Sequence, residues 1–361
     1  MSYLVLASER AVDGGAQRAL GALAPAVRDL GWHVSALVGE DGPLVEVLRG
    51  HDIETVVSAD ADALGDLPVD LVLSMGAATH AWAGAAAERH HEEVDAAWWL
   101  ELTLRGRPAE AAALATPALL AAAPTAVAAQ ALHLRDPELP VEVIAPGTDW
   151  GDVAQHHRAG PEARASLGLT PDDDLLVMVS RLDPMKGQDT AIDALASLVD
   201  RGRDVHLALV GGAIIGHEGD LADRLRHQAD DRGVGARVHH LGFVDDPGPW
   251  HAAGSIAIQA SAHEAFGLSI VEALAHGTPV IASATDGPSE ILDDGRYGVL
   301  TAPGDADALA RAIADLLEDD GRRSRLAAAG PGRAEVFTPQ AAAQRWSDVL
   351  PPAYPTHCWP T

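Results

Sequence analysis

Lysine is almost absent from this chain. Lys186 is the only lysine among 361 residues, and Lys plus Arg total 25 against 53 Asp plus Glu, for a formal net charge of -28. Such a chain lacks the cationic face that nucleic-acid binding needs, and anionic lipid repels it. We therefore expect no nucleic-acid partner and at most a peripheral membrane contact.

Cysteine and long apolar runs are also scarce. Cys358 is the only cysteine, so no internal disulfide can form, which favours a reducing, cytoplasmic compartment. No apolar run approaches the roughly 18 residues of a membrane span, and the Ala-rich stretch 119–134 is too short and small-sided for one. Residues 1–7 are too short and uncharged for a signal peptide and predict a first strand.

Two explanations account for the missing lysines. A GC-rich genome favours Arg, Ala and Gly over Lys without selection on the protein. A salt-rich cytoplasm favours surface carboxylates, because the salt screens their mutual repulsion. Codon bias does not explain an excess of 28 acidic residues, so the composition favours the intracellular protein of a halophile.

Short apolar runs alternate with helical stretches along the whole chain. This alternation predicts strand–helix–strand units and parallel sheets, hence an α/β fold. The predicted strands are 3–7, 34–38, 55–57, 71–74, 97–100, 141–144, 175–179, 206–210, 238–241, 256–259, 280–282 and 298–300. The predicted helices are 14–30, 189–200, 220–232, 268–276 and 306–318.

The turn formed by residues 146–149 divides this pattern into two sets. It predicts an N-terminal domain at 1–150 and a C-terminal domain at 151–361, both Rossmann-like and doubly wound. Ligands of open parallel sheets bind beyond the carboxyl ends of the strands. Two facing domains therefore predict an interdomain cleft.

Arg181 and Lys186 follow the predicted strand 175–179. Arginine offers a planar fork and lysine a mobile point charge, so the pair can bind neighbouring phosphate oxygens. The alternative is that Lys186 is an ordinary surface lysine. A chain without other lysines favours the first interpretation.

Glu264 and Glu272 form the second constellation. Gly267 marks a turn, a helix is expected from Leu268, and the backbone N–H groups of Phe266, Gly267 and Leu268 would make an anion site at its N-terminus. The alternatives are a solvated helix residue for Glu272 and a charge favourable to the helix dipole for Glu264. Apolar neighbours at 270–271 and 273–275 favour a functional Glu272.

These groups together predict a diphosphate pocket that uses no metal and no other cofactor. The acidic run 172–174 holds paired carboxylates. It precedes its strand and follows Pro171, which is typical of a solvated turn rather than a Mg²⁺ site.

Residues 177–291 resemble the C-terminal domain of family-4 retaining, nucleotide-sugar-dependent glycosyltransferases, which have the GT-B fold. The resemblance rests on the two cations, two glycine turns, the paired glutamates and a late Gly-rich turn. These residues are Arg181, Lys186, Gly187, Gly211, Gly212, Gly242, Phe243, Val244, Glu264, Glu272 and 286–291.

The resemblance implies a role for each matched residue. Arg181 and Lys186 would bind the donor diphosphate, Glu272 the ribose hydroxyls, and Glu264 would lie by the transferred sugar. Phe243 would border the nucleobase, and the backbone at Phe266–Leu268 would touch the diphosphate and the sugar.

The N-terminal half resembles the family less. Gly14 and Gly15 after the first strand fit its glycine loop, where the backbone approaches the donor closely. The family often has an active-site histidine at the end of a mid-domain strand, and the corresponding stretch of this chain offers Glu101 instead. His80 is the alternative active-site histidine, and a surface histidine is the plain interpretation of it.

The sequence thus predicts a retaining, metal-independent glycosyltransferase. It would move a hexosyl unit from a UDP-, GDP- or ADP-sugar to a sugar, lipid-linked or small-molecule acceptor. The alternatives are a non-catalytic nucleotide-sugar-binding paralogue, or an epimerase or phosphorylase of the same fold.

Overall fold

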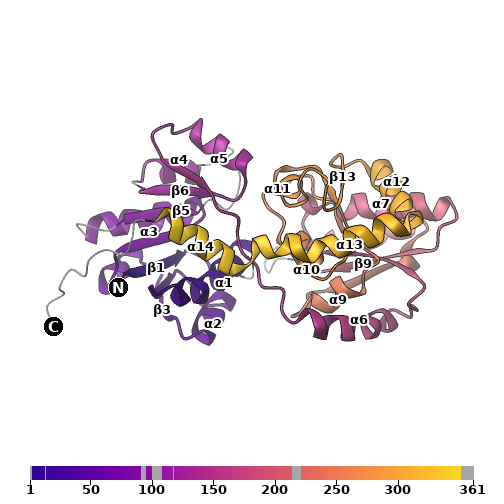
Figure 1. Ribbon diagram of the computed structural model, residues 1–361, viewed down its shortest axis with the longest axis horizontal. Helices are drawn as coiled ribbons and strands as arrows, with labels where there is room; N and C mark the ends of the chain where they lie inside the picture. Colours follow the sequence, from indigo (N-terminus) through magenta and orange to yellow (C-terminus); the bar gives the residue numbers. More distant parts are fainter. Residues whose placement is uncertain are drawn as a thin grey trace. The chain divides into compact units, whose positions relative to one another are not determined.

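The structure is a computed structural model, and it describes residues 2–12, 14–90, 95–99, 108–116, 118–213 and 221–350. Contacts between residues divide the chain into two compact units (Figure 1). The first comprises the chain up to Asp149 together with the segment from Phe337, and the second runs from Trp150 to Val336. None of the helices in the described part of the chain has the length and apolar character needed to cross a membrane.

The described residues of the first unit contain a seven-stranded parallel sheet in the order β3-β2-β1-β4-β5-β6-β7. Its strands are β1 (Tyr3–Ser8), β2 (His33–Val38), β3 (Glu54–Val57), β4 (Leu71–Met75), β5 (Asp95–Trp99), β6 (Leu120–Ala123) and β7 (Val141–Val143). Its helices are α1 (Gly15–Asp29), α2 (Pro43–Gly50), η1 (Ala61–Asp66), α3 (Ala77–His90), α4 (Pro108–Leu114), α5 (Ala126–His133) and α14 (Pro339–Val349).

The described residues of the second unit contain a six-stranded parallel sheet in the order β10-β9-β8-β11-β12-β13. Its strands are β8 (Asp174–Val179), β9 (Val205–Val210), β10 (Val238–Gly242), β11 (Ile256–Gln259), β12 (Val280–Ser283) and β13 (Val299–Thr301). Its α-helices are α6 (Val153–Ser166), α7 (Gln188–Asp200), α8 (Leu221–Asp231), α9 (Gly248–Ala253), α10 (Leu268–Ala275), α11 (Asp286–Ile291), α12 (Ala306–Glu318) and α13 (Asp320–Ala334). The described residues between α6 and α14 also form three short 3-10 helices: η2 (Pro184–Lys186), η3 (Gly235–Arg237) and η4 (Glu335–Phe337).

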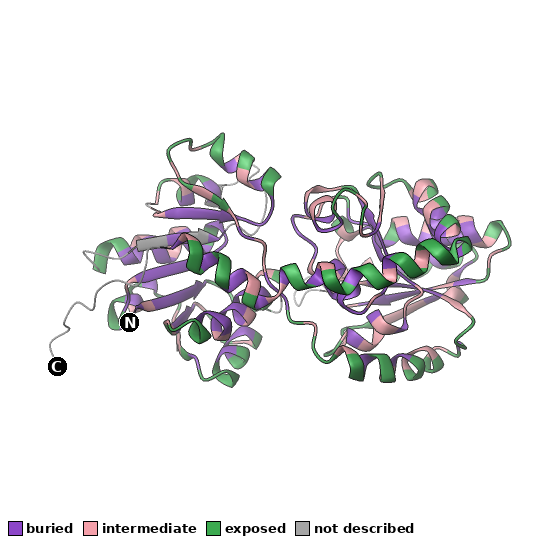
Figure 2. Cartoon of the chain, viewed as in Figure 1, coloured by how far each residue is buried: buried purple, intermediate pink, exposed green. Residues whose placement is uncertain are grey.

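Both sheets are doubly wound, as the sequence predicts. Each central strand is an uninterrupted apolar run because helices cover both faces of the sheet. Figure 2 shows the central strands as buried and the outer faces of the helices as exposed. In β1 and β8 the apolar residues in the middle of the strand are all buried. The predicted α/β class and the two Rossmann-like sheets are confirmed.

Twelve of the described strands and five of the described α-helices were predicted, whereas α2, α3, α4, α5, α6, α9, α11, α13 and α14 were not. β6 was not predicted, because its sequence Leu-Ala-Ala-Ala has no β-branched residue and reads as helix. The C-terminal domain was predicted to include all of 151–361, but α14 packs on α1 in the first unit. Trp346 of α14 meets Trp99 of β5 edge-on, with ring centroids 5.6 Å apart. A large aromatic buried in this way fixes the helix to the first sheet.

The order of the second sheet has a functional consequence. The chain leaves β8 to one side toward β9, and later returns on the other side as β11. The loops after β8 and β11 therefore emerge from neighbouring strands at the point where the winding reverses. This switch point is where open α/β sheets bind ligands.

Candidate active site

Lys186 occupies a fixed turn after β8. Asp183 caps the short helix η2, its Oδ1 accepting from the N–H of Met185 at 2.9 Å. Gly187 then turns the chain into α7 with φ at +75°, and a Cβ there would lie 2.1 Å from the carbonyl oxygen of Ala260. Only glycine allows this approach. The turn is thereby pressed against the end of β11.

The ammonium group of Lys186 lies on the carboxylate of Glu264. The distance from Nζ to Oε2 is 2.6 Å, and the side chains are 19% and 12% exposed. The same oxygen accepts from Nε2 of Gln259 at 3.1 Å and from Oγ of Ser261 at 3.2 Å. Two of the predicted site residues, 78 positions apart, thus meet at the switch point of the sheet.

Arg181 lies in the same loop but binds another carboxylate. Its Nη2 is 3.3 Å from Oδ2 of Asp183, and about half of its side chain is exposed. The loop itself is held by Gln188, whose buried amide donates to the carbonyl of Arg181 at 2.8 Å and to Oγ of Ser180 at 3.0 Å. The guanidinium group is therefore accessible on a rigid backbone.

The N-terminus of α10 comes shortly after Glu264 in the chain. Gly267 is its N-cap, in the left-handed region, and supplies no side-chain cap. The loop before it is packed closely against α11, because a Cβ on Gly287 would lie 2.0 Å from the carbonyl oxygen of Phe266. The first amides of α10 lack a side-chain acceptor, which leaves this end suited to an anion. The side chain of Phe266 is buried and Leu268 is partly exposed.

Glu272 lies inside the unit rather than on a solvated helix face, so that alternative is wrong. It is 5% exposed. Its Oε2 lies 3.3 Å from Nε2 of His251, a residue of α9 that is also buried. The carboxylate is thus held from a neighbouring helix.

Three more histidines are linked to Glu272 through His276. His276, one turn further along the chain, donates through Nδ1 to the main-chain carbonyl of Glu272 at 2.7 Å. Its Nε2 lies 2.8 Å from Nδ1 of His156, and His157 approaches the same ring with centroids 6.2 Å apart. Nε2 of His156 is 3.1 Å from a carboxylate oxygen of Asp246. The described part of the chain holds no group of three or more His, Cys, Asp or Glu that could bind a metal ion.

Phe243 presents an exposed aromatic ring beyond β10. It is 66% exposed, unusual for a phenylalanine. It follows Gly242, whose carbonyl accepts from the N–H of Gly211 at 2.8 Å, and Gly212 lies against its backbone. A ring exposed on a backbone that is held in this way offers a flat apolar face on which a nucleobase can stack.

The remaining predicted residues belong to the first unit. Gly14 is the N-cap of α1, and Gly15 is the first residue of that helix. His80 lies on α3 with none of its surface exposed, so the surface interpretation is wrong. Its complete burial also leaves no ring atom to meet a substrate, which argues against the predicted catalytic role. Glu101 lies outside the described residues.

Burial of two histidines gives a prediction about acid stability. Burial lowers the pKa of both His80 and His276 to about 4. Between pH 6.5 and 4 the unfolded chain binds these two protons and the folded chain does not, so stability falls as the pH falls. Each group contributes a slope of about 1.4 kcal/mol per pH unit in this window. Chemical denaturation at a series of pH values measures it.

The control for that prediction is His80→Gln compared with the unchanged chain. The variant should lower the slope by about 1.4 kcal/mol per pH unit between pH 6.5 and 4, whatever its stability at neutral pH, because His206, His239 and His240, whose pKa values burial also lowers, keep their own contributions. A slope unaffected by the substitution would show that His80 is not the group that titrates. Ordinary carboxylates add to acid unfolding mainly below this window.

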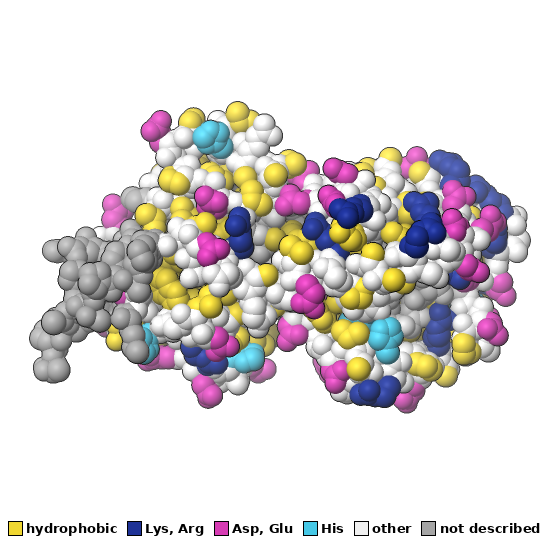
Figure 3. Space-filling view, viewed as in Figure 1, with side chains coloured by type: hydrophobic (Ala, Val, Ile, Leu, Met, Phe, Trp, Pro, Cys, Tyr) yellow, Lys and Arg dark blue, Asp and Glu magenta, His cyan; other side chains and the backbone are white. Residues whose placement is uncertain are grey.

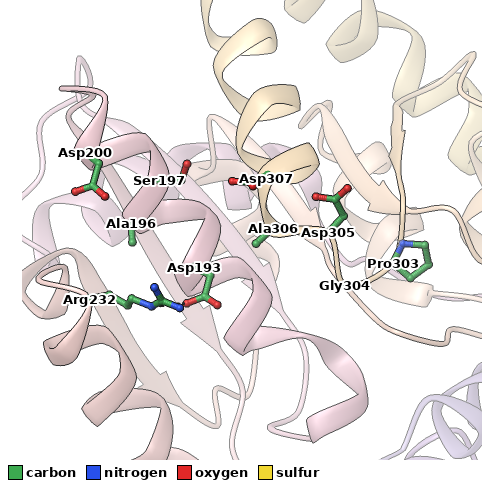
Figure 4. Close-up of a pocket in the computed structure, with 10 residues that line it drawn as sticks. All are labelled: Asp193, Ala196, Ser197, Asp200, Arg232, Pro303, Gly304, Asp305, Ala306 and Asp307. Atoms are coloured by element: carbon green, nitrogen blue, oxygen red, sulfur yellow. Dashed lines mark ion pairs between the residues drawn. The ribbon is translucent and has the colours of Figure 1, made fainter.

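A surface hollow elsewhere in the second unit serves as a comparison. Figure 4 shows it between α7 and the loop that leads into α12, with a volume of about 650 Å³. Its lining carries Asp193, Asp200, Asp305 and Asp307 but only one cation, Arg232, which is bonded to Asp193 at 3.0 Å. Carboxylates repel a diphosphate, so this hollow is the wrong place for an anionic donor.

A family comparison covers the unit that holds the site. Residues 160–333 match the family model of group 1 glycosyl transferases. This match agrees with the resemblance seen in the sequence over 177–291, at the level of that broad family. It covers most of the second unit, and includes Arg181, Lys186, Glu264 and Glu272.

Individual relatives extend the comparison. The chain is 36% identical over 167 residues to the lipopolysaccharide core biosynthesis glycosyltransferase LpsE of Rhizobium meliloti, covering 46% of each chain. It is also 36% identical over 220 residues to a D-inositol 3-phosphate glycosyltransferase of Frankia alni, covering 57% of this chain and 51% of the relative. The chain thus spans about half the length of the curated relatives it matches.

A solved structure covers nearly the whole chain. HepE of Anabaena, crystallised in complex with UDP, matches with a TM-score of 0.85 and 25% identity, over 96% of this chain and 99% of its own. Structures with TM-scores of 0.85 and 0.84 hold the same protein with UDP and glucose and with UDP-glucose. The predicted GT-B fold is confirmed by this match.

Several contacts at the site had not been predicted. Gln259, Ser261 and His251 carry no motif of their own, since a lone amide, hydroxyl or imidazole in a strand end or a short helix is common. His276 offered a weak signal, because it lies four residues after Glu272 on one helix face. The contact of His156 with His276 joins residues 120 positions apart and had no local signal.

Proposed function

We propose that this protein is a glycosyltransferase that moves a hexosyl unit from a nucleoside diphosphate sugar to an acceptor hydroxyl. The single observation that carries the proposal is the bond between Lys186 and Glu264 at the switch point of the second sheet. It brings the ammonium group of the only lysine next to a carboxylate. A sugar diphosphate can use both, the ammonium for the diphosphate and the carboxylate for the sugar hydroxyls. The family match over 160–333 supports the same activity.

In this reaction the nucleoside diphosphate is the leaving group. The bond between the anomeric carbon and the phosphate oxygen breaks, the acceptor oxygen bonds to that carbon, and the acceptor loses its proton. Negative charge grows on the β-phosphate as the bond breaks. Lys186, Arg181 and the N–H groups of Gly267 and Leu268 would therefore stabilise the transition state more than the ground state.

Glu264 has two parts in this proposal. Before the donor binds, it neutralises Lys186 and keeps a partly buried ammonium group satisfied. When the diphosphate enters, the three N–H donors of the ammonium can bind both the carboxylate and a phosphate oxygen. Glu264 then lies beside the transferred sugar and can accept hydrogen bonds from its hydroxyls.

The donor is proposed to bind along the carboxyl ends of β8 to β11. Glu272 would accept from the ribose hydroxyls, since one carboxylate can accept from two vicinal hydroxyl groups. Phe243 would stack on the base. Among UDP, GDP and ADP we favour UDP, because HepE was crystallised with UDP and with UDP-glucose. Retention at the anomeric carbon, independence from metal and a cytoplasmic location belong to the proposal.

A thermal-shift panel tests the donor, and product mass tests the reaction. UDP, GDP and ADP, each alone and as its sugar, are added in molar KCl; a ligand of the folded state raises the unfolding midpoint. The preferred donor is then incubated with candidate sugar and lipid-linked acceptors. Addition of one hexose to an acceptor supports the proposal. Binding with neither transfer nor hydrolysis would indicate a non-catalytic paralogue, and conversion of the donor sugar without transfer would indicate an epimerase.

A further inference from the structure

The contact between His251 and Glu272 has features of a functional arrangement rather than of packing. Both residues are buried, at 2% and 5% exposure. A buried polar pair is costly to form and is weak support for stability, since well-packed apolar groups in its place are often no worse. Ile270, Val271, Ala273 and Leu274 of α10 show that apolar residues fill the neighbouring positions.

His251 is held both at its main chain and at its ring. Oγ1 of Thr278 donates to its main-chain carbonyl at 2.6 Å, which ties the end of α9 to the segment after α10. The ring of His276 stacks on it with centroids 5.7 Å apart and planes 25° apart. The stacked ring of His276 and the contact with Glu272 together restrict rotation of the imidazole plane.

Hydrogen-bond polarity then assigns the proton. A carboxylate oxygen accepts, so Nε2 of His251 must carry the hydrogen that it directs at Glu272. Nδ1 of His251 is buried and has no hydrogen-bond partner among the described residues. Burying an unpaired acceptor lone pair at Nδ1 costs less free energy than burying an unpaired N–H there. The tautomer with its hydrogen on Nε2 therefore agrees with the surroundings of both ring nitrogens.

We propose that His251 is a positioning residue for the donor. It holds one oxygen of Glu272 and so fixes the plane in which the carboxylate accepts from the vicinal hydroxyls of the ribose. A carboxylate that rotates freely would lose the orientation needed for two hydroxyls at once. His276 supports the same residue from its main-chain side. The inference rests on the proposed function, because it takes Glu272 as the ribose-binding group.

The test compares UDP with 2'-deoxy-UDP by calorimetry. Four proteins are used: the unchanged chain, Glu272→Gln, His251→Phe and His251→Gln. The unchanged chain should bind UDP about tenfold more tightly, because the 2'-hydroxyl donates to a charged acceptor. His251→Phe should reduce that ratio to about two, while its affinity for 2'-deoxy-UDP stays within about twofold. His251→Gln, whose amide can donate in place of the imidazole, should restore much of the ratio.

The outcomes separate the inference from the proposed function. If His251→Phe weakens both nucleotides by the same factor, or leaves the tenfold ratio intact, the positioning role is wrong although the ribose site stands. If the unchanged chain and Glu272→Gln both fail to distinguish the two nucleotides, Glu272 does not bind the ribose, and the inference falls with that part of the proposed function. Far-UV circular dichroism and the unfolding midpoint confirm that each variant is folded.

Discussion

Lys186→Ala is expected to lower turnover of the donor by about 10²–10³-fold, the usual cost of losing one donor that stabilises growing charge. Nζ of Lys186 lies 2.6 Å from Oε2 of Glu264, on a turn that packs closely against the end of β11 at Gly187. Among the described residues, no other cation contacts that carboxylate. The loss should appear in both kcat and kcat/KM, because the charge that Lys186 meets develops in the transition state.

Two controls separate catalysis from folding in this experiment. Arg226→Ala removes one positive charge from an exposed pair with Asp223 in the same unit and should leave turnover within about twofold. Lys186→Ala also leaves Glu264 without its cation, so the unfolding midpoint of this variant shows whether the unpaired carboxylate destabilises the fold.

Ligand binding gives a further check on the same residue. Lys186→Ala should weaken UDP strongly and uridine hardly at all, because only UDP carries the diphosphate. Turnover near that of the unchanged chain in Lys186→Ala, with midpoints unchanged, would remove Lys186 from the mechanism.

Stability should rise steeply with salt, and this is the second large effect. The formal net charge is -28, and acidic side chains are scattered over the visible face of the molecule (Figure 3). Their repulsion acts over about 10 Å in 0.1 M salt and only about 3 Å in 1 M salt. We expect the unfolding midpoint to rise by about 10 °C between 0.1 M and 2 M KCl, which corresponds to about 3–5 kcal/mol for units of this size.

Variants with fewer acidic side chains provide the control for this salt effect. Replacing exposed carboxylates such as Glu54, Asp66 and Asp231 with amides should reduce the response to KCl in proportion to the number removed. A midpoint that does not rise with KCl would leave a GC-rich genome as the explanation for the missing lysines.

Local sequence was enough to predict most of the fold. Strands such as β8 and β11 are apolar runs buried by helices on both faces. Such runs can be recognised in the sequence without knowing which residues pack against them. α14 was not among the predicted helices, and an amphipathic helix does not show by itself which of two sheets it covers. The contact of Trp346 with Trp99, 247 positions away, decides it.

The site was predictable where its residues follow strand ends. Lys186 and Glu264 each come after a buried strand, and doubly wound sheets bring such ends together. The supports of Glu272 were not predictable, because they depend on how α6, α9 and α10 pack. For His80 the family resemblance suggested an active-site histidine and the plain interpretation was a surface one; the surface interpretation fails because His80 lies on the buried side of the Ala-rich helix α3.

Selective labelling of the only lysine tests the central claim most directly. The unchanged chain is treated with acetic anhydride, and mass spectrometry follows acetylation of Lys186 and of the α-amino group, which serves as the internal control. A donor diphosphate bound at Lys186 should slow acetylation of that lysine at least tenfold at saturating UDP, GDP or ADP, while the α-amino group reacts as before. Equal acetylation of Lys186 with and without each of the three nucleotides would contradict the account.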